Sequence, residues 1–114
     1  MKLTQKKCIP CEDSSIKPFT KVQAREYAVL VPTWELATNA KKISRTVLFK
    51  DFVKALAFVN KVGTLAEKEG HHPDIIINYN KVTFELWTHS IGGLSENDFI
   101  IAAKINALLG KLKK

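Results

Sequence analysis

The segment "EGHHPDIIINYNKVTFELWTH", residues 69–89, decides the expected fold because apolar side chains alternate on both sides of a polar turn. A two-residue turn at Asn80 and Lys81 sets six apolar or aromatic side chains on one face, in the pairs Tyr79–Val82, Ile77–Phe84 and Ile75–Leu86. A slip by one residue would bury Asn78 and Glu85 instead. The pattern therefore predicts an antiparallel hairpin with one face, Tyr79 included, in the core.

The chain's three histidines, His71, His72 and His89, all fall inside this segment. The same register places His72 opposite His89, and Asp74 opposite Trp87, on the face away from the core. We therefore expect the imidazoles to gather at the open end of the hairpin, with the Trp87 ring beside them.

Apolar periodicity predicts three helices along the chain. One begins after Thr20 and runs until Pro32, and a second spans residues 51–69 and stops at Gly70. The last begins at Ser95, with Asp98 completing a capping box, and runs to about Leu112.

Another hairpin is expected between the first two helices. The segments "TWELAT" and "KISRTVLF" alternate as strands around the polar turn "NAKK". Pairing Thr38 with Ile43 sets Trp34 against Val47 on one face. The resulting order α-β-β-α-β-β-α predicts an α+β fold, a four-stranded antiparallel sheet with three helices packed on one face.

Length and composition suit one domain. The chain has 114 residues, 46% of them apolar, and we divide it into a flexible leader, residues 1–17, and a single domain, residues 18–114. It has no apolar run of about 18 residues or more, so no membrane span is expected. The leader lacks the apolar centre of a signal peptide, and we expect a cytoplasmic protein.

Charge and cysteine content favour neither a nucleic-acid partner nor a metal. The net charge is +7, but lysines occur singly or in pairs with acidic residues between them, which is typical of a solvated surface. Cys8 and Cys11 form one C-x-x-C in a proline-containing tail. A structural zinc ion needs four ligands, and a redox pair would follow a strand at a helix start, so we expect reduced thiols.

Three interpretations of the histidine cluster remain open from the residues alone. The imidazoles could be ordinary surface side chains at a strand end. They could bind a metal, although neighbours such as His71 and His72 point to opposite sides of an extended chain. They could also carry acid–base chemistry, because an imidazole gives and takes protons near neutral pH.

A longer pattern surrounds the cluster. The run E-x-x-x-H-H-P from Glu67 to Pro73 is followed by Tyr79, His89 and Asp98, and the segments "YNKV" and "THSIGGLSENDF" accompany it. This pattern, with the order of elements, resembles the pterin-4a-carbinolamine dehydratases over about residues 18–112. The resemblance implies a substrate class: tetrahydropterins hydroxylated at C4a, left by aromatic amino acid hydroxylases. Loss of water yields the quinonoid dihydropterin, and neither metal nor other cofactor is implied.

Roles for single residues follow from the resemblance. His71 and His89 are expected to transfer protons, and His72 to hold the substrate. Substrate contacts are also expected from Pro73 and from Trp87, whose flat ring suits an aromatic substrate. Glu67 and Asp98 either orient imidazoles or contact the pterin.

The last helix suggests self-association. Its apolar side chains form two adjacent stripes, namely Ile101, Ile105 and Leu108, and Ile100, Ala103 and Ala107. We expect this arc to be wider than one sheet can bury, so that a second copy covers it, and edge strands offer another self-contact. A homo-oligomer, dimer or tetramer, follows, and the resemblance also implies a tetramer. The alternative function is a non-catalytic binding protein on the same fold, a transcription-factor dimerisation coactivator or an assembly factor.

Overall fold

The computed structural model describes residues 2–8 and 17–112. In chain order the elements are η1 (Leu3–Gln5), α1 (Lys21–Ala28), β1 (Glu35–Leu36), β2 (Ile43–Leu48), α2 (Phe52–Glu69), β3 (Asp74–Asn78), β4 (Lys81–Leu86), η2 (His89–Ile91) and α3 (Glu96–Leu112). The two η elements are single turns of 3-10 helix. The predicted α+β class and the order of helices and strands are confirmed.

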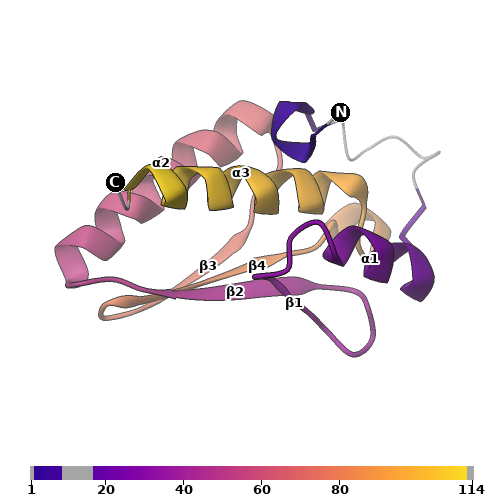
Figure 1. Cartoon of the computed structure of the whole chain (residues 1–114), viewed down its shortest axis with the longest axis horizontal. Helices are drawn as coiled ribbons and strands as arrows, with labels where there is room; N and C mark the ends of the chain where they lie inside the picture. Colours follow the sequence, from indigo (N-terminus) through magenta and orange to yellow (C-terminus); the bar gives the residue numbers. More distant parts are fainter. Residues whose placement is uncertain (1, 9–16, 113–114) are drawn as a thin grey trace.

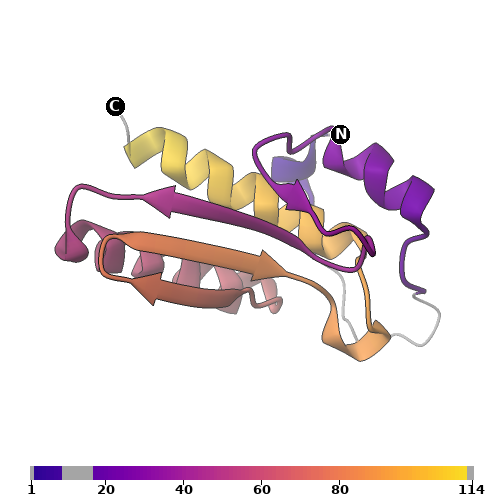
Figure 2. The same cartoon turned by 90° about the horizontal axis from the view of Figure 1, so that it is seen from below.

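The four strands form one antiparallel sheet in the order β1-β2-β4-β3. Helices α2 and α3 lie across one face, and α1 packs beside them against β1 and α3 (Figure 1). Seen from below, the strands lie in front of the helices (Figure 2). Strand β3 is an edge strand, and β4 is its neighbour in the interior of the sheet. The residues just before Asp74 and just after Leu86 therefore lie together at one corner of the sheet.

Local capping explains where the helices begin and end. Thr20 caps α1 through a complete capping box with Gln23. Asp51 caps α2, and Gly70 ends α2 in the left-handed conformation at φ 68°, which glycine adopts without steric cost. Both starts were predicted, but α1 ends at Ala28, before the proline where we expected it to stop.

The register of the second hairpin differs from the prediction by two residues. Ile77 pairs with Val82 and Asn78 with Lys81, so the turn consists of Tyr79 and Asn80. Tyr79 has φ 55° and is 68% exposed, and its predicted packing in the core is wrong. The face assignment of the other apolar residues survives, because a shift of two positions keeps each side chain on its face.

Contacts with a neighbouring strand end explain this turn. The backbone N–H of Phe49 donates to the Asn80 carbonyl at 2.8 Å, and the Asn80 side chain donates to the Phe49 carbonyl at 3.0 Å. Asn80 is thus held by the end of β2, which no pattern inside the hairpin reveals.

The first hairpin is displaced in the same way. Glu35 pairs with Ser44 and Leu36 with Ile43, and β1 is only two residues long. Trp34 is therefore not opposite Val47, although both are buried as expected. The indole N–H of Trp34 donates to the Asn106 side chain on α3 at 2.9 Å, which ties this strand to the helix layer.

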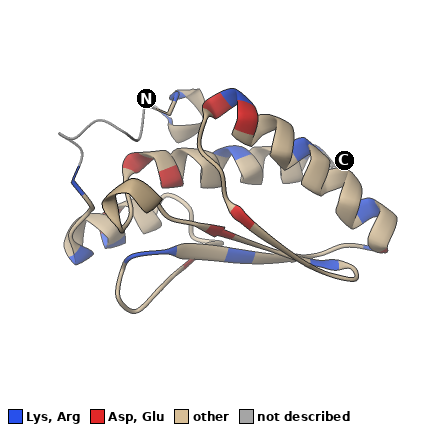
Figure 3. Cartoon of the chain, turned by 180° about the vertical axis from the view of Figure 1, so that it is seen from behind, with Lys and Arg blue, Asp and Glu red and all other residues tan. Residues whose placement is uncertain are grey.

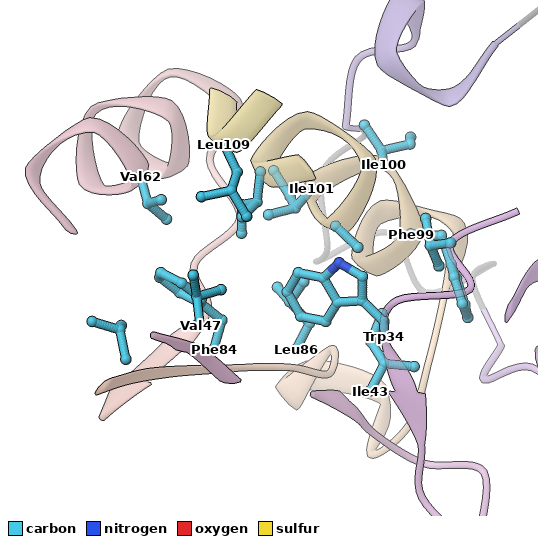
Figure 4. Close-up of a cluster of buried hydrophobic side chains, with 14 of the residues drawn as sticks. Trp34, Ile43, Val47, Val62, Phe84, Leu86, Phe99, Ile100, Ile101 and Leu109 are labelled. Atoms are coloured by element: carbon cyan, nitrogen blue, oxygen red, sulfur yellow. The ribbon is translucent and has the colours of Figure 1, made fainter. Parts of the chain in front are cut away.

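The core lies between the sheet and the helices α2 and α3 (Figure 4). Phe84 and Leu86 of β4 are fully buried and face Val62 of α2 and Ile101 of α3 across this layer. Burying a side chain of this size contributes roughly 1.5–3 kcal/mol. The core thus fixes β4, and with it the chain that leads to the histidine cluster.

Helix α3 buries half of its expected apolar arc within the chain. Ile100, Ile101 and Ile105 are at most 1% exposed and need no second copy, whereas Ala103 and Leu108 are half-buried and Ala107 is exposed. Residues 2–8 contribute to this cover: η1 packs on α3, and Leu3 is buried in the core cluster. This part of the expected leader therefore lies against the domain.

Charged positions are interspersed over the molecule (Figure 3). Lys and Arg lie on the helices and along the sheet, with acidic positions among them. Over the part of the chain that the structure describes, no helix combines the length and apolarity needed to cross a membrane.

Candidate functional site

The candidate site is a hollow of about 350 Å³ at the open end of the second hairpin. It is lined by residues before β3 and after β4, namely Gly70, His71, His72, Pro73, Asp74, Trp87, His89 and Ser90. The predicted gathering of the three imidazoles and Trp87 at this end of the hairpin is therefore present. It arises from the loops beyond the paired strands, because β3 begins only at Asp74.

His71 forms the buried wall of the hollow. Its ring is 4% exposed, and its Nε2 lies 2.6 Å from Oδ1 of Asp98, which is fully buried in the first turn of α3. The other carboxylate oxygen of Asp98 accepts from the Thr88 hydroxyl at 2.8 Å and from the Ser95 N–H at 3.0 Å. Three donors thus hold this carboxylate behind the ring.

This network defines the proton positions. A carboxylate only accepts hydrogen bonds, so Nε2 of His71 carries the proton that faces Asp98. In the neutral ring, Nδ1 is then the nitrogen that accepts a proton. Thr88 gives its single hydroxyl proton to Asp98, and the Ser95 hydroxyl therefore donates to Thr88 at 2.9 Å.

His72 occupies an open environment. Its ring has a different partner from that of the adjacent His71: His72 Nε2 is hydrogen-bonded to Glu67 on the last turn of α2. The side chains are 58% and 79% exposed, so water screens this pair and it contributes little to stability. Glu67 itself does not line the hollow.

Trp87 and His89 form another part of the lining. Their rings stack with centroids 3.9 Å apart and planes 25° apart. The indole N–H of Trp87 is directed to Asp74 Oδ2 at 3.4 Å. The predicted proximity of Asp74 and Trp87 therefore exists, although the observed register pairs Asp74 with Glu85.

A closed loop presents His89 to the hollow. Thr88 and Gly93 exchange backbone hydrogen bonds at 2.8 and 3.4 Å, which closes the loop around η2. A Cβ atom at Gly93 would lie 2.8 Å from Cβ of Pro18, closer than any ordinary contact. Glycine at this position thus lets the loop pack against the start of the domain.

The predicted site residues divide into two groups. The lining group contains His71, His72, His89, Pro73 and Trp87. Glu67 and Asp98 lie behind imidazoles and are absent from this lining, so the geometry favours an orienting role over pterin contact for both. The expected strand pairing of His72 with His89 is not observed, because β3 begins at Asp74 and β4 ends at Leu86, although both side chains line the hollow.

Some residues of the site escape the sequence patterns. Ser90 lines the hollow, and nothing in its spacing singles it out, whereas Asp74 was expected beside Trp87 but not named as a site residue. Thr88 is different: it continues the buried alternation of Phe84 and Leu86 on β4, and it is 1% exposed. A hydroxyl at the end of a core-facing series needs a partner, and this could have indicated a buried acceptor such as Asp98.

A larger hollow of about 730 Å³ lies elsewhere, between the N-terminal segment, α1 and α3. Its lining contains no histidine, and of its charged side chains, Lys2, Lys6 and Glu96, the last two pair with each other at 2.6 Å. We place the candidate site in the smaller hollow, because titratable and aromatic groups converge there.

Metal ligation finds no support among the described residues. Within residues 2–8 and 17–112, no group of three or more His, Cys, Asp or Glu side chains is arranged to hold a metal ion. Cys8 is described, whereas Cys11 lies outside the described residues, so their predicted state stays a prediction.

Comparison with known proteins places this geometry in a family. The profile of the family "Pterin 4 alpha carbinolamine dehydratase" matches residues 17–108. The chain belongs to the pterin-4a-carbinolamine dehydratase family. A Halorhodospira halophila protein, assigned provisionally to these dehydratases by its name, is 47% identical over 95% of this chain and 98% of its own length. An Arabidopsis thaliana protein named pterin-4-alpha-carbinolamine dehydratase 2, mitochondrial, is 45% identical over 93% of this chain and 58% of its own length.

Solved structures of dehydratase-like proteins share the fold. A Brucella melitensis protein described as a transcriptional coactivator/pterin dehydratase superposes with a TM-score of 0.75 at 34% identity, over 81% of this chain and 98% of its own. A pterin dehydratase-like protein described as a RuBisCO assembly factor in the alpha-carboxysome gives a TM-score of 0.59 at 23% identity, over 68% and 90%. The second likeness concerns the fold alone. Membership of the dehydratase family supports a lyase kind of activity for this chain.

Proposed function

We propose that the protein dehydrates 4a-hydroxytetrahydropterin to quinonoid dihydropterin and water. The observation that carries the proposal is the convergence of three imidazoles and an indole on one hollow. In the cell this reaction would support tetrahydropterin recycling for aromatic amino acid hydroxylases, as the resemblance implies.

The reaction needs two proton transfers and no change of oxidation state. The bond between C4a and the hydroxyl oxygen breaks, and an acid supplies the proton with which the hydroxyl leaves as water. A base removes the proton from N5, and the electron pair of that bond forms the C4a–N5 double bond. Positioned imidazoles suit both transfers, and each is worth about 10²–10⁴-fold in rate.

His71 and His89 are the proposed proton-transfer pair. Asp98 holds the ring of His71 through Nε2, which leaves Nδ1 as its basic nitrogen. His89 lines the same hollow and stacks on Trp87. We assign neither ring as the acid or the base.

His72 is proposed to hold the substrate rather than to transfer its protons. It lines the hollow, is exposed, and is oriented by Glu67. Pro73 and Trp87 offer apolar and aromatic surface for the pterin ring.

The deciding experiment is an assay of the purified protein on 4a-hydroxytetrahydropterin made in place by a hydroxylase. We expect the intermediate to decay much faster than its spontaneous rate. The control is the double variant His71→Ala, His89→Ala, which should leave only the spontaneous rate. A wild-type protein no faster than this control would refute the proposal.

The second candidate is a binding protein without catalysis. Two related structures carry such descriptions, one as a coactivator and one as an assembly factor. Exposed apolar side chains give the observation that favours it: Leu48, Phe52, Val53 and Leu56 lie near one another in the chain, where β2 leads into α2. Activity that is absent despite a folded, pterin-binding protein would favour this candidate.

We also propose that this apolar surface packs against a second copy, as part of the homo-oligomer that the resemblance implies. Val53 is 72% exposed and Phe52 44% exposed, which is costly for side chains left in water. A cytoplasmic location remains part of the proposal, although one relative is named mitochondrial.

A further inference from the structure

A buried ion pair lies beside the candidate site and has no part in the proposed reaction. Glu69, the last residue of α2, accepts from Lys104 Nζ of α3 at 2.7 Å through Oε2. Its Oε1 accepts from the backbone N–H of Cys8 at 3.0 Å. Both carboxylate oxygens are therefore engaged, and the side chains of Glu69 and Lys104 are 7% and 16% exposed, partly buried at the edge of a surface hollow.

The ionised state of Glu69 agrees with these contacts. Burial pushes the pKa of Glu69 up, but the bonds from Lys104 and from the Cys8 N–H outweigh burial, so the net shift of its pKa is downward. Glu69 is therefore ionised near neutral pH.

The ion pair joins the end of α2, which leads directly into His71, to α3, which carries Asp98. Gly70 and His71 both donate their backbone N–H groups to the Ala66 carbonyl, at 2.9 and 3.3 Å, so His71 moves with the end of α2. Asp98 and Lys104 both belong to α3. The 2.6 Å contact between His71 and Asp98 therefore depends on how the end of α2 sits on α3, and the ion pair ties these elements directly.

The N-terminal segment, residues 2–8, bridges the same two elements. Besides the bond from Cys8 to Glu69, Lys6 donates to Glu96 in the first turn of α3 at 2.6 Å. The Tyr27 hydroxyl donates to the same oxygen of Glu96 at 2.9 Å. In Figure 1 the turn η1 lies beside α3, near the end of α2.

Stability alone gives no good reason for this arrangement. Taking two charges out of water costs several kcal/mol, and apolar side chains of similar volume often stabilise a protein as well or better. What such a pair adds is a constraint on geometry, because charge-assisted hydrogen bonds restrict the distance and orientation of the groups that they join. Such geometry matters most next to a group whose position must be exact to a fraction of an ångström.

We propose that Glu69 and Lys104, with the N-terminal segment, are positioning residues that hold His71 against Asp98. None of them lines the hollow, so they act through His71. The expected effect on kcat rests on the proposed function, whereas the expected effect on the position of the His71 ring does not.

The test follows the His71 ring by long-range ¹H–¹⁵N NMR in the free protein. The wild-type spectrum should show one tautomer with the proton on Nε2, slowed in exchange by its bond to Asp98. We expect Glu69→Gln and Lys104→Met to lose this slow exchange and to mix the tautomers. Lys104→Arg should preserve the wild-type spectrum, because its guanidinium can still pair with the carboxylate.

A matched control removes an ion pair away from these helices. Lys42 pairs with Glu85 on the sheet at 3.4 Å, and Lys42→Met should leave the His71 spectrum unchanged. If the function is as proposed, Glu69→Gln should also lower kcat on the order of 10- to 100-fold with little change in KM.

The outcomes separate the two proposals. Wild-type His71 signals in folded Glu69→Gln and Lys104→Met proteins would overturn the positioning role, whatever the activity. If Lys104→Met does not fold, Glu69→Gln and a variant lacking residues 2–8 provide the same comparison. A wild-type protein without dehydratase activity would defeat the proposed function and leave the NMR result to decide the positioning role.

Discussion

The indole ring of Trp87 stacks on the imidazole of His89 with their centroids 3.9 Å apart. His89 begins a short 3-10 turn and is exposed, so the fold around it restrains its ring little. Trp87 directly follows β4, whose buried side chains fix the position of that strand in the core. By stacking on Trp87, the ring of His89 is therefore restrained as well. One wall of the hollow is thus an aromatic pair whose position derives from the interior of the sheet.

The histidines should differ in how their removal affects the reaction. We expect His71→Ala and His89→Ala each to slow dehydration by about 10²–10⁴-fold, the usual worth of a general acid or base. His72→Ala should act mainly on KM, because we assign it to substrate binding. Steady-state kinetics of the three variants checks this. Rates near wild type in both His71→Ala and His89→Ala would contradict the assignment.

Asp98→Asn should reverse the hydrogen bond to His71 while keeping the shape of the side chain. With the Thr88 hydroxyl and the Ser95 N–H still donating to its oxygen, the new amide would direct an N–H toward Nε2. His71 would then carry its proton on Nδ1 and could no longer accept one there. We expect kcat to fall by about 10²-fold or more with the fold intact. Unchanged kcat in a folded Asp98→Asn protein would show that the tautomer of His71 is immaterial.

Acid should loosen the contact between the N-terminal segment and α3. The hydrogen bond from Lys6 lowers the pKa of Glu96 below its ordinary 4.5, with burial opposing this and the bond from Tyr27 assisting it. A lowered pKa means that the contribution to stability is present above pH 4.5 and is lost as pH falls through the folded value. Urea unfolding at several pH values should therefore show a steeper acid loss for wild type than for Glu96→Gln. Parallel curves would contradict the prediction.

At alkaline pH the same pair weakens for the opposite reason. The hydrogen bond to Glu96 raises the pKa of Lys6 above its ordinary 10.5. Its contribution is complete below pH 10.5 and disappears as pH rises through the folded value. The pair therefore acts fully across the neutral range.

Self-association should depend on the start of α2 rather than on α3. We expect Val53→Lys and Leu56→Lys to lower the mass found by sedimentation equilibrium, because these side chains are exposed and apolar. Val22→Lys on α1, where Val22 is 61% exposed, is the control and should not change the mass. Ile105→Lys is unsuitable for this purpose, because Ile105 is fully buried and a charge there would unfold the chain. A mass unaffected by the α2 variants would exclude this surface.

Removal of metals should leave the activity intact. The proposed proton transfers use imidazoles alone, so exhaustive treatment with a chelator should not change kcat. Metal analysis of the purified protein accompanies the assay. Stoichiometric zinc, with activity lost on its removal and restored on its return, would overturn this expectation.

The sequence predicts which side chains face the core better than it predicts which residues oppose each other. Both hairpins are shifted by two residues from the expected register. A shift of two leaves every side chain on its face, so alternation cannot detect it. For the second hairpin, the contact between Asn80 in its turn and Phe49 at the end of β2 favours the observed register. Such a contact becomes visible only once the strands are assembled.

The same limit applies to the candidate site. The gathering of His71, His72 and His89 follows from their places around one hairpin, and it was predictable despite the wrong register. The hydrogen-bond partner of His71 was not predictable in this way, because Asp98 belongs to α3 and not to the hairpin. The sequence already explains Asp98 as a helix cap that accepts from the Ser95 N–H. A residue with such a local role gives no sign that its other carboxylate oxygen binds an imidazole.

The two-residue turn of the second hairpin has a consequence for the order of folding. It joins the two segments that line the hollow, residues 70–74 and 87–90, so closing the hollow needs only a short loop. Short loops close at low entropic cost and early in folding. Asp98 belongs to a helix that must dock separately, across 27 positions of sequence from His71. A folding chain can therefore assemble the aromatic and imidazole walls first, and His71 acquires its buried carboxylate only when α3 arrives.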